Sequence, residues 1–302
     1  MSLMVVGTVA LDDLKTPAGE MKNLLGGSAS HLSMSASLFT KVHLAGIIGE
    51  DFPQEHLQLF KKKKINIDSV VRVSGKTFHW CGEYKKEDLN SAITLKTELG
   101  VITQYVPRVT PAQKNIPNVF LANIDPETQW KFLKCMNKPK FVGMDTMNLW
   151  INTMRESVLR LMKEVDLLVL NDGEVRLLTG ETNIIKSAKR LRKMGPKIIV
   201  IKKGEHGVFC YSDKFLFGFP AFPVSDVIDP TGAGDTFAGG LMGYLAKKGK
   251  INEKNLRQAL IYATICSSFN VEGFAAEKTA PLTLANIYKR KKIFLKFMKG
   301  PS

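Results

Sequence analysis

The sequence contains few cysteines and no long apolar run. Its four cysteines, Cys81, Cys135, Cys210 and Cys266, are scattered and show no C-x-x-C spacing. This pattern favours a protein of the reducing cytoplasm. No apolar stretch approaches the ~20 residues of a membrane-spanning helix. The first residues run directly into an apolar strand, so we expect no signal peptide and predict a cytoplasmic protein without a membrane partner.

Several common phosphate-binding motifs are also missing. The chain contains no G-x-x-x-x-G-K-[ST] sequence, and Phe237 stands where a G-x-G-x-x-G motif starting at Gly232 needs its third glycine. These absences exclude a P-loop and a dinucleotide-binding turn at this position. The H-R-D and D-F-G sequences of protein kinases are absent as well. The 302 residues, 44% of them hydrophobic, suffice for one large domain or two small ones with a buried core.

Acidic residues are in the minority, since 43 Lys and Arg against 28 Asp and Glu give a formal net charge of +15. A charge of this size is typical of nucleic-acid or membrane-surface binders. The basic runs 61–64, 247–248 and 289–292, however, each stand at the end of a predicted amphipathic helix. Helix C-termini favour cations. We therefore interpret the charge as a solvated surface that attracts anionic ligands, with nucleic-acid binding as the alternative.

The segment from Asp229 to Asp235 reads Asp-Pro-Thr-Gly-Ala-Gly-Asp and joins a predicted strand at 224–228 to a predicted helix. The first backbone N–H groups of a helix lack intrahelical partners and carry a partial positive charge. This junction therefore favours an anion such as a phosphate. Gly232 and Gly234 have no Cβ, so the backbone can approach that anion closely.

Asp235 stands beside this turn, where a carboxylate would repel a phosphate unless it has a chemical task. The task that fits is to accept the proton of a hydroxyl group that attacks the phosphate. The alternative is structural, because Asp229 and Asp235 could merely cap the turn and the helix. The residues alone leave both interpretations open.

From residue 117 onward, predicted strands alternate with predicted helices. The strands are 118–123, 141–145, 166–171 and 197–202, and the helices are 127–136, 151–163 and 183–194. Such alternation indicates a parallel sheet with helices on both faces, which binds ligands beyond the carboxyl ends of its strands. The polar residues at those ends are Asn123, Asp145, Asn171 and Lys202, and each is a site candidate that could instead form a turn.

The first hundred residues show a different pattern. Strands at 4–10 and 42–48 are expected in the main sheet, whereas shorter, more polar strands suggest a small separate β layer. These shorter strands are 69–73, 77–84 and 92–97. Phe78 and Trp80 share one face of their strand. They could stack on a sugar or base, or pack against the body of the protein or a partner subunit.

The glycine turn and its aspartate resemble the signature of the ribokinase/PfkB-type carbohydrate kinase family, which phosphorylates a hydroxyl of a small sugar or nucleoside with ATP and Mg²⁺. The resemblance implies an α/β fold, a ribokinase-like three-layer α/β/α arrangement with a mostly parallel sheet and a small β lid. It also implies a single domain over residues 1–302, with a discontinuous lid from about 12–25 and 69–104. In that family Asp235 would be the catalytic base, and Gly232, Ala233 and Gly234 would form the anion hole.

The same resemblance implies residues on the substrate side. Asp12 matches the aspartate that binds substrate hydroxyls, and Gly26-Gly27 matches a glycine pair that lets backbone amides approach the substrate. The family often has Asn a few residues later, whereas this chain continues with Ser28 and, three residues on, His31. Both become substrate-side candidates, although a histidine that opens a helix could equally be structural.

On the nucleotide side, Asn171 and Glu174 reproduce the family's N-x-x-E motif, which implies that they act near Mg²⁺ and the phosphates, Glu174 through water. Asn171 could also cap the next helix. The further residues expected to bind the nucleotide are Gly204, Gly207, Thr231 and Asn270, and Asp229 is the expected ligand of a monovalent cation such as K⁺. Lys202 could neutralise a phosphate, but the family does not require a lysine here, so a surface role is the alternative.

These residues together predict transfer of the γ-phosphoryl group of ATP to a hydroxyl of a small sugar, with ATP and Mg²⁺ as cofactors. A nucleoside acceptor is the alternative within the enzyme class. A basic nucleic-acid-binding protein on this fold is the alternative outside it. Exposed lid strands would need covering, so we also predict a homodimer formed through the lid.

Overall fold

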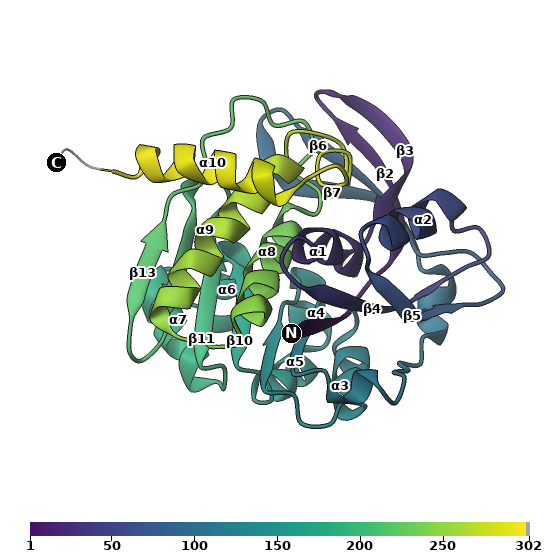
Figure 1. Ribbon diagram of the computed structural model, residues 1–302, viewed down its shortest axis with the longest axis horizontal. Coiled ribbons are helices and arrows are strands. Elements are labelled where there is room, and N and C mark those ends of the chain that lie inside the picture. Colours follow the sequence, from purple (N-terminus) through teal and green to yellow (C-terminus); the bar gives the residue numbers. More distant parts are fainter. Residues whose placement is uncertain (300–302) are drawn as a thin grey trace.

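The computed structural model describes residues 1–299, in which nine strands form the main sheet (Figure 1). The strand order is β13-β12-β11-β10-β9-β8-β1-β4-β5. Every neighbouring pair from β11 to β5 is parallel, and β12 and β13 continue the sheet antiparallel. The strands are β1 (Ser2–Val6), β4 (Lys41–Ile48), β5 (Asn66–Arg72), β8 (Asn118–Leu121), β9 (Phe141–Met144), β10 (Leu167–Asn171), β11 (Ile198–Lys202), β12 (Val208–Tyr211) and β13 (Leu216–Phe219). The mostly parallel sheet predicted from the sequence is confirmed.

Helices cover both faces of this sheet, because its central strands are apolar on both sides. Leu3 and Val5 of β1 pack with α1, α2, α8 and α9, whereas Met4 and Val6 pack with α3, α5, α6 and α7. The covering helices are α1 (Ser28–Ala36), α2 (Gln54–Lys62), α3 (Pro126–Lys134), α4 (Asn148–Thr153), α5 (Arg155–Met162), α6 (Asp172–Thr179), α7 (Ile184–Lys193), α8 (Ala233–Lys248) and α9 (Glu253–Asn270), and α10 (Leu284–Phe297) packs against α9. The predicted three-layer α/β/α arrangement is therefore correct.

A second sheet, which we call the lid, contains four strands within the described chain. Its order is β3-β2-β6-β7, with β2 parallel to β6 and the outer pairs antiparallel. The lid strands are β2 (Ala10–Thr16), β3 (Gly19–Gly26), β6 (His79–Lys85) and β7 (Asp88–Glu98). In Figure 1 the lid lies to one side of the main sheet, beyond α1. It is assembled from two excursions of the chain, the first between β1 and α1 and the second after β5.

The structure corrects the predicted division between the main sheet and the lid. Residues 69–72 belong to β5 and pair with β4 in the main sheet, because Val70 packs into one helical layer and Val71 into the other. The predicted strand 4–10 is also wrong in extent, since β1 ends at Val6 and the chain enters the lid at Ala10.

Three further expectations differ from the structure. Residues 224–228 form no strand, and Ile228 is held by a hydrogen bond from its amide to the carbonyl of Val271 (2.7 Å). The helix predicted at 151–163 is two helices, α4 and α5, separated at Met154. The basic run 289–292 lies inside α10 and not at its end. Arg290 in that run pairs with Glu272 at 2.8 Å and is therefore part of the folded structure rather than a solvated terminus.

Helix α8 is enclosed by α1 on one side and α9 on the other, and small residues make the close approach possible. A Cβ on Gly239 would overlap the carbonyl of Leu32, and a Cβ on Gly240 would lie 2.9 Å from the Cα of Ala263. The hydroxyl of Ser35 in α1 donates to the carbonyl of Thr236 at 2.8 Å. This packing fixes the position of the N-terminus of α8, which begins at the glycine turn.

Candidate active site

Gly232 is the N-cap residue of α8 and adopts a left-handed conformation with φ at 71°. Side chains disfavour this conformation, so the turn requires glycine here. The amide of Ala233 donates to the carbonyl of Pro230 at 3.1 Å, whereas helix geometry leaves the amides of Gly234 and Asp235 without intrahelical acceptors. The start of α8 therefore presents backbone donors and the positive end of the helix dipole to an anion.

Two buried polar side chains hold the turn before α8. Asn270, at the end of α9, donates to the carbonyl of Thr231 at 2.7 Å and accepts a hydrogen bond from the hydroxyl of Thr236 at 2.8 Å. Asp229 accepts hydrogen bonds from the amides of Thr231 and Ala275, both at 2.8 Å. Asn270 and Asp229 thus fix the shape of the glycine turn, and the ligand contacts expected of them stay predictions.

His31 lies in the core behind the turn. Its ring fills the space beside Gly232, where any Cβ would overlap it, and only 2% of the residue is exposed. Burial lowers the pKa of His31 to about 4, so the ring is neutral at physiological pH. This position makes His31 a support for the glycine turn, and its contact with an acceptor stays a prediction.

Three acidic side chains and one amine converge near the start of α8. Asp145 follows β9, Glu174 and Asp235 lie in the first turns of α6 and α8, and Lys202 ends β11. The Nζ atom of Lys202 lies 2.7 Å from where a Cβ on Gly234 would stand.

Burial dominates the electrostatics of this cluster. It raises the pKa of Asp235 to about 6 and that of Glu174 to about 7, and the charge of Lys202 opposes both shifts. Burial, followed by the charge of Asp235, raises the pKa of Asp145 well above its usual value. Oδ1 of Asp145 is buried and has no hydrogen-bond partner in residues 1–299. The excess of buried carboxylates over Lys202 favours a bound cation.

Asn171 and Glu174 form a capping box at the start of α6. The Asn171 amide donates to Glu174 Oε2 and the Glu174 amide donates to Asn171 Oδ1, both at 2.8 Å. The helix-capping interpretation of Asn171 is therefore correct. Oε1 of Glu174 takes no part in the capping box, so this oxygen is available for a water-mediated contact.

Asp12 lies on lid strand β2 and faces the body of the protein. Its carboxylate fills the space that a Cβ on Gly26 would need. Burial, with the charges of Asp229 and Asp235 next in importance, raises the pKa of Asp12 to about 8. Asp12 therefore shares one buried electrostatic environment with the start of α8. Gly27 follows as the N-cap residue of α1, with φ at 92°.

Two lid aromatics share the face of Asp12. Trp80 stands opposite Asp12 in the β2–β6 register, and its indole N–H donates to the Thr94 hydroxyl at 3.1 Å. Tyr84 lies on the same face, and its hydroxyl is 3.3 Å from that of Thr231 in the glycine turn. Trp80 is a predicted site residue, whereas Tyr84 is not. The period of two that places Phe78 and Trp80 on one face also includes position 84 and could have found it.

The glycine loop after β11 lies against the tip of the lid. Gly204 opens η3 (Gly204–His206) with φ at 53°, and Gly207 follows it with φ at 93°. The side chain of Asn90, on β7, occupies the space beside Gly204, with Oδ1 2.5 Å from the position of a Cβ. Together with the contact of Tyr84 to Thr231, this describes a lid closed over the start of α8.

Ser28 and Asn123 have protein partners. The hydroxyl of Ser28 donates to the Asn123 carbonyl at 2.7 Å and accepts the Thr8 amide at 3.2 Å. Oδ1 of Asn123 accepts the indole N–H of Trp150 at 2.9 Å. Both residues therefore have structural roles beside the site, and their contact with an acceptor stays a prediction.

A glycine turn at a helix start, a buried acid beside it and a lid that carries a second acid suit a phosphotransferase that acts on a hydroxyl group. A family model for pfkB family carbohydrate kinases matches residues 2–282. The chain belongs to this family, as its sequence motifs predict. No helix in residues 1–299 combines the length and the apolar character that a membrane crossing needs.

Relatives and solved structures agree with this assignment. The chain is similar to the cytidine kinase of Thermococcus kodakarensis, with 33% identity over 268 residues that cover 86% of this chain and 94% of that protein. Its fold resembles the crystal structure of the Methanocaldococcus jannaschii nucleoside kinase, at a TM-score of 0.78 and 21% identity over 97% of this chain and 98% of that one. A ribokinase II from E. coli in complex with ATP and Mg²⁺ gives a TM-score of 0.81 at 16% identity over 97% and 99% of the two chains. The chain is thus a kinase of sugars or nucleosides with the ribokinase fold.

Proposed function

We propose that the protein transfers the γ-phosphoryl group of ATP to a hydroxyl group of a nucleoside, with Asp235 as the general base. The observation that carries this proposal is the position of Asp12, which is buried on the face of the lid whose Tyr84 reaches Thr231, directly before the start of α8 and Asp235. The carboxyl group of Asp12 is thereby placed to hold an acceptor hydroxyl and the carboxylate of Asp235 to deprotonate it, both next to backbone donors for a phosphate.

The chemistry of each group fits this assignment. A base with a pKa near 6 is ionised at neutral pH and can still accept a proton from the attacking hydroxyl. The amides of Gly234 and Asp235 would stabilise the charge that develops on the transferred group, and Lys202 would add a positive charge beside Gly234. Ala233, whose amide is bonded to Pro230, would contribute mainly to the shape of the turn.

The buried carboxylates suit Mg²⁺, which would neutralise charge on the phosphates of ATP. Glu174 would hold it through water, because Mg²⁺ keeps several waters and takes few protein ligands. Gly204, Gly207 and Thr231 would line the nucleotide, with Asn171 ordering Glu174. A K⁺ ion near Asp229 is a further part of the proposal, tested by replacing K⁺ with Na⁺ in the activity assay.

A nucleoside is favoured over a free sugar by the lid aromatics. Trp80 and Tyr84 share the face of Asp12, and an aromatic ring next to an acceptor-binding carboxylate suits a planar base. The similarity to a cytidine kinase over most of both chains supports the same choice. A sugar acceptor is the second candidate, since the family model describes carbohydrate kinases.

The proposal includes a cytoplasmic location and a homodimer through the lid. The four cysteines are free, as expected in a reducing compartment. Strand β7 is an edge of the lid sheet and exposes Ile93 and Leu95, which a second lid would cover. A monomer in light scattering at assay concentration would rule the dimer out.

The test is an ATP-consumption assay with Mg²⁺ and parallel panels of nucleosides and free sugars, run on wild type and Asp235→Asn. We expect turnover with a nucleoside and a loss of about 10²–10⁴-fold or more in the variant, the usual contribution of a general base. Asp226→Asn is the matched control, because Asp226 is an exposed aspartate of the same loop. Turnover with sugars alone would show that the acceptor is a sugar and not a nucleoside. Wild-type turnover in Asp235→Asn would exclude Asp235 as the general base.

A further inference from the structure

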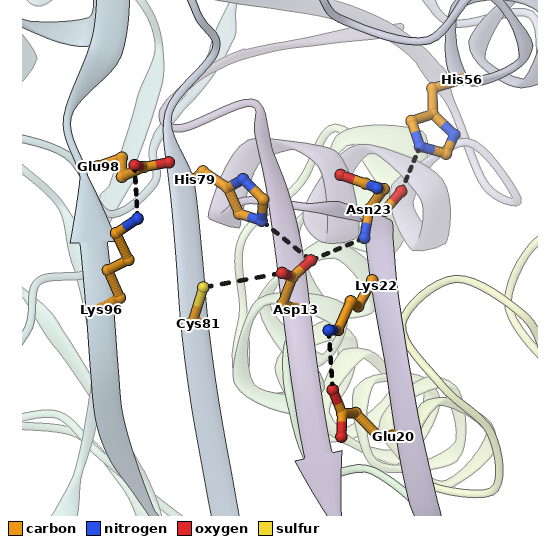
Figure 2. Close-up of polar contacts among 9 residues, drawn as sticks. All are labelled: Asp13, Glu20, Lys22, Asn23, His56, His79, Cys81, Lys96 and Glu98. Atoms are coloured by element: carbon orange, nitrogen blue, oxygen red, sulfur yellow. Dashed lines mark hydrogen bonds and ion pairs between the residues drawn. The ribbon is translucent and has the colours of Figure 1, made fainter.

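The outer face of the lid, opposite to Asp12, carries a carboxylate, an imidazole and a thiol in one cluster (Figure 2). Asp13 of β2 and His79 and Cys81 of β6 place one ligand atom each within 4.8 Å of one another. We propose that Asp13, His79 and Cys81 bind a divalent cation of the Zn²⁺ type at this face of the lid.

The distances suit such an ion after small side-chain rotations. Asp13 Oδ1 lies 3.0 Å from Nε2 of His79, and Asp13 Oδ2 lies 3.9 Å from Sγ of Cys81. Zinc bonds of about 2.0–2.3 Å in a tetrahedron separate the ligand atoms by roughly 3.3–3.8 Å. One ligand atom of each residue lies within 4.8 Å of the other two, about 1 Å more than such a separation, so side-chain rotation would bring the three atoms to corners of a zinc tetrahedron with water at the fourth.

The β-sheet positions these side chains without a loop. His79 and Cys81 are two residues apart on β6 and point to the same face, and Asp13 stands opposite Cys81 in the neighbouring strand. The amide of Asn23 donates to Asp13 Oδ1 at 2.8 Å and orients this carboxylate. A site on paired strands needs little reorganisation to bind a metal.

The imidazole provides a second, independent indication. Nε2 of His79 is buried and, in spite of its short distance to Asp13, makes no hydrogen bond of acceptable geometry in residues 1–299. A buried ring nitrogen without a hydrogen bond costs free energy, which a metal bond would recover. The side chains of His79 and Asp13 keep 21% and 24% of their surface exposed, so the cluster borders the solvent.

The ligand set separates this site from the one proposed for catalysis. Mg²⁺ prefers oxygen ligands and water, whereas a set of one sulfur, one nitrogen and one oxygen favours Zn²⁺ and its analogue Co²⁺. Glu98 faces His79 across β6 and β7, but its carboxylate is paired with Lys96 at 2.7 Å (Figure 2). The bound ion would link β2 to β6 and would thereby stabilise the position of β2, the strand that carries Asp12.

The test is a Co²⁺ titration of the reduced protein in excess Mg²⁺, which occupies the catalytic site. We expect one Co²⁺ per chain, a thiolate-to-cobalt charge-transfer band, and displacement by Zn²⁺. Cys81→Ser should abolish the band. It should also weaken Co²⁺ binding by more than about 10–100-fold, the usual cost of losing only an outer partner of a metal site. Cys135→Ser is the control, because the thiol of Cys135 lies near the carbonyls of Pro107 and Lys131 and outside the cluster.

His79→Gln provides a second variant that keeps a polar side chain of similar size, and circular dichroism would verify its fold. We expect it to retain the fold and to lose most of the Co²⁺ affinity. A wild type that binds no Co²⁺ in excess Mg²⁺, or a charge-transfer band that persists in Cys81→Ser, would overturn the proposal. Neither experiment measures kinase activity, so the proposed cation site and the proposed kinase function can fail independently.

Discussion

Replacement of Asp12 by Asn should stabilise the ligand-free protein while it weakens acceptor binding. The pKa of Asp12 is about 8, against an ordinary value of 3.8. A carboxyl group whose pKa is higher in the folded state binds more protons when folded. The free energy of unfolding therefore falls as the pH rises from about 4 to about 8. Asn carries no ionisable proton at this position, so Asp12→Asn removes the Asp12 contribution to that loss.

The size of the effect follows from the pKa difference. At pH 7 the unfolded chain ionises Asp12 freely and the folded protein does not, which costs at most about 4 kcal/mol at about 1.4 kcal/mol per pH unit. At pH 5 the same reasoning gives at most about 2 kcal/mol. The stability gain of Asp12→Asn should thus grow between these two pH values.

Urea unfolding of wild type and Asp12→Asn at pH 5 and pH 7 measures this difference. Asp13→Asn is the matched control, because the hydrogen bond from the Asn23 amide and the nearby His79 ring outweigh the burial of Asp13 and hold its pKa below the ordinary value. Asp13→Asn should therefore lower the free energy of unfolding at neutral pH, whereas Asp12→Asn should raise it. An equal or lower stability of Asp12→Asn at pH 7, with no change between the two pH values, would refute the reasoning.

Three other changes test the site. Gly232→Ala should lower stability by about 1–2 kcal/mol for its left-handed backbone, and by more for the overlap with His31. Gly180→Ala, at φ 70° with open space around it, measures the backbone cost alone in the same unfolding assay. Lys202→Met should shift the acidic limb of the kcat/KM profile upward by about 1–3 pH units, because Lys202 lowers the pKa of Asp235; an unmoved profile would exclude this role. Tyr84→Phe should lower kcat/KM less than tenfold, the contribution of one hydrogen bond. A larger loss would show that the hydroxyl does more than hold the lid against Thr231.

The elements that the sequence predicts well are those with one dominant signal. The central strands carry continuous apolar runs that only a sheet covered on both faces accommodates, so β8 to β11 and the polar residues at their ends are readable. The segment 224–228 has three apolar residues, yet it forms no strand. Its neighbour in the structure is the chain around Val271, which local sequence does not reveal.

The residues of the site also divide into those with a local sequence signal and those placed by contacts between distant segments. The glycine turn and Asp235 are predictable because helix starts bind anions and Gly232 needs its left-handed conformation. The location of His31 behind that turn is not, because it depends on α1 packing against α8 across about two hundred residues of sequence. Tyr84 was missed for a similar reason, since its contact with Thr231 depends on how the lid closes.

The glycines of α8 have a consequence for the order of folding. Each glycine inside a helix costs about 1 kcal/mol relative to alanine, and α8 contains Gly239, Gly240 and Gly243. The isolated segment is therefore a poor helix, which becomes stable only when α1 and α9 enclose it. We expect the two ends of the chain to meet before this helix forms, so the phosphate turn at its start is among the last parts of the molecule to take shape. A partly folded chain would then have its central strands in place and still bind no nucleotide.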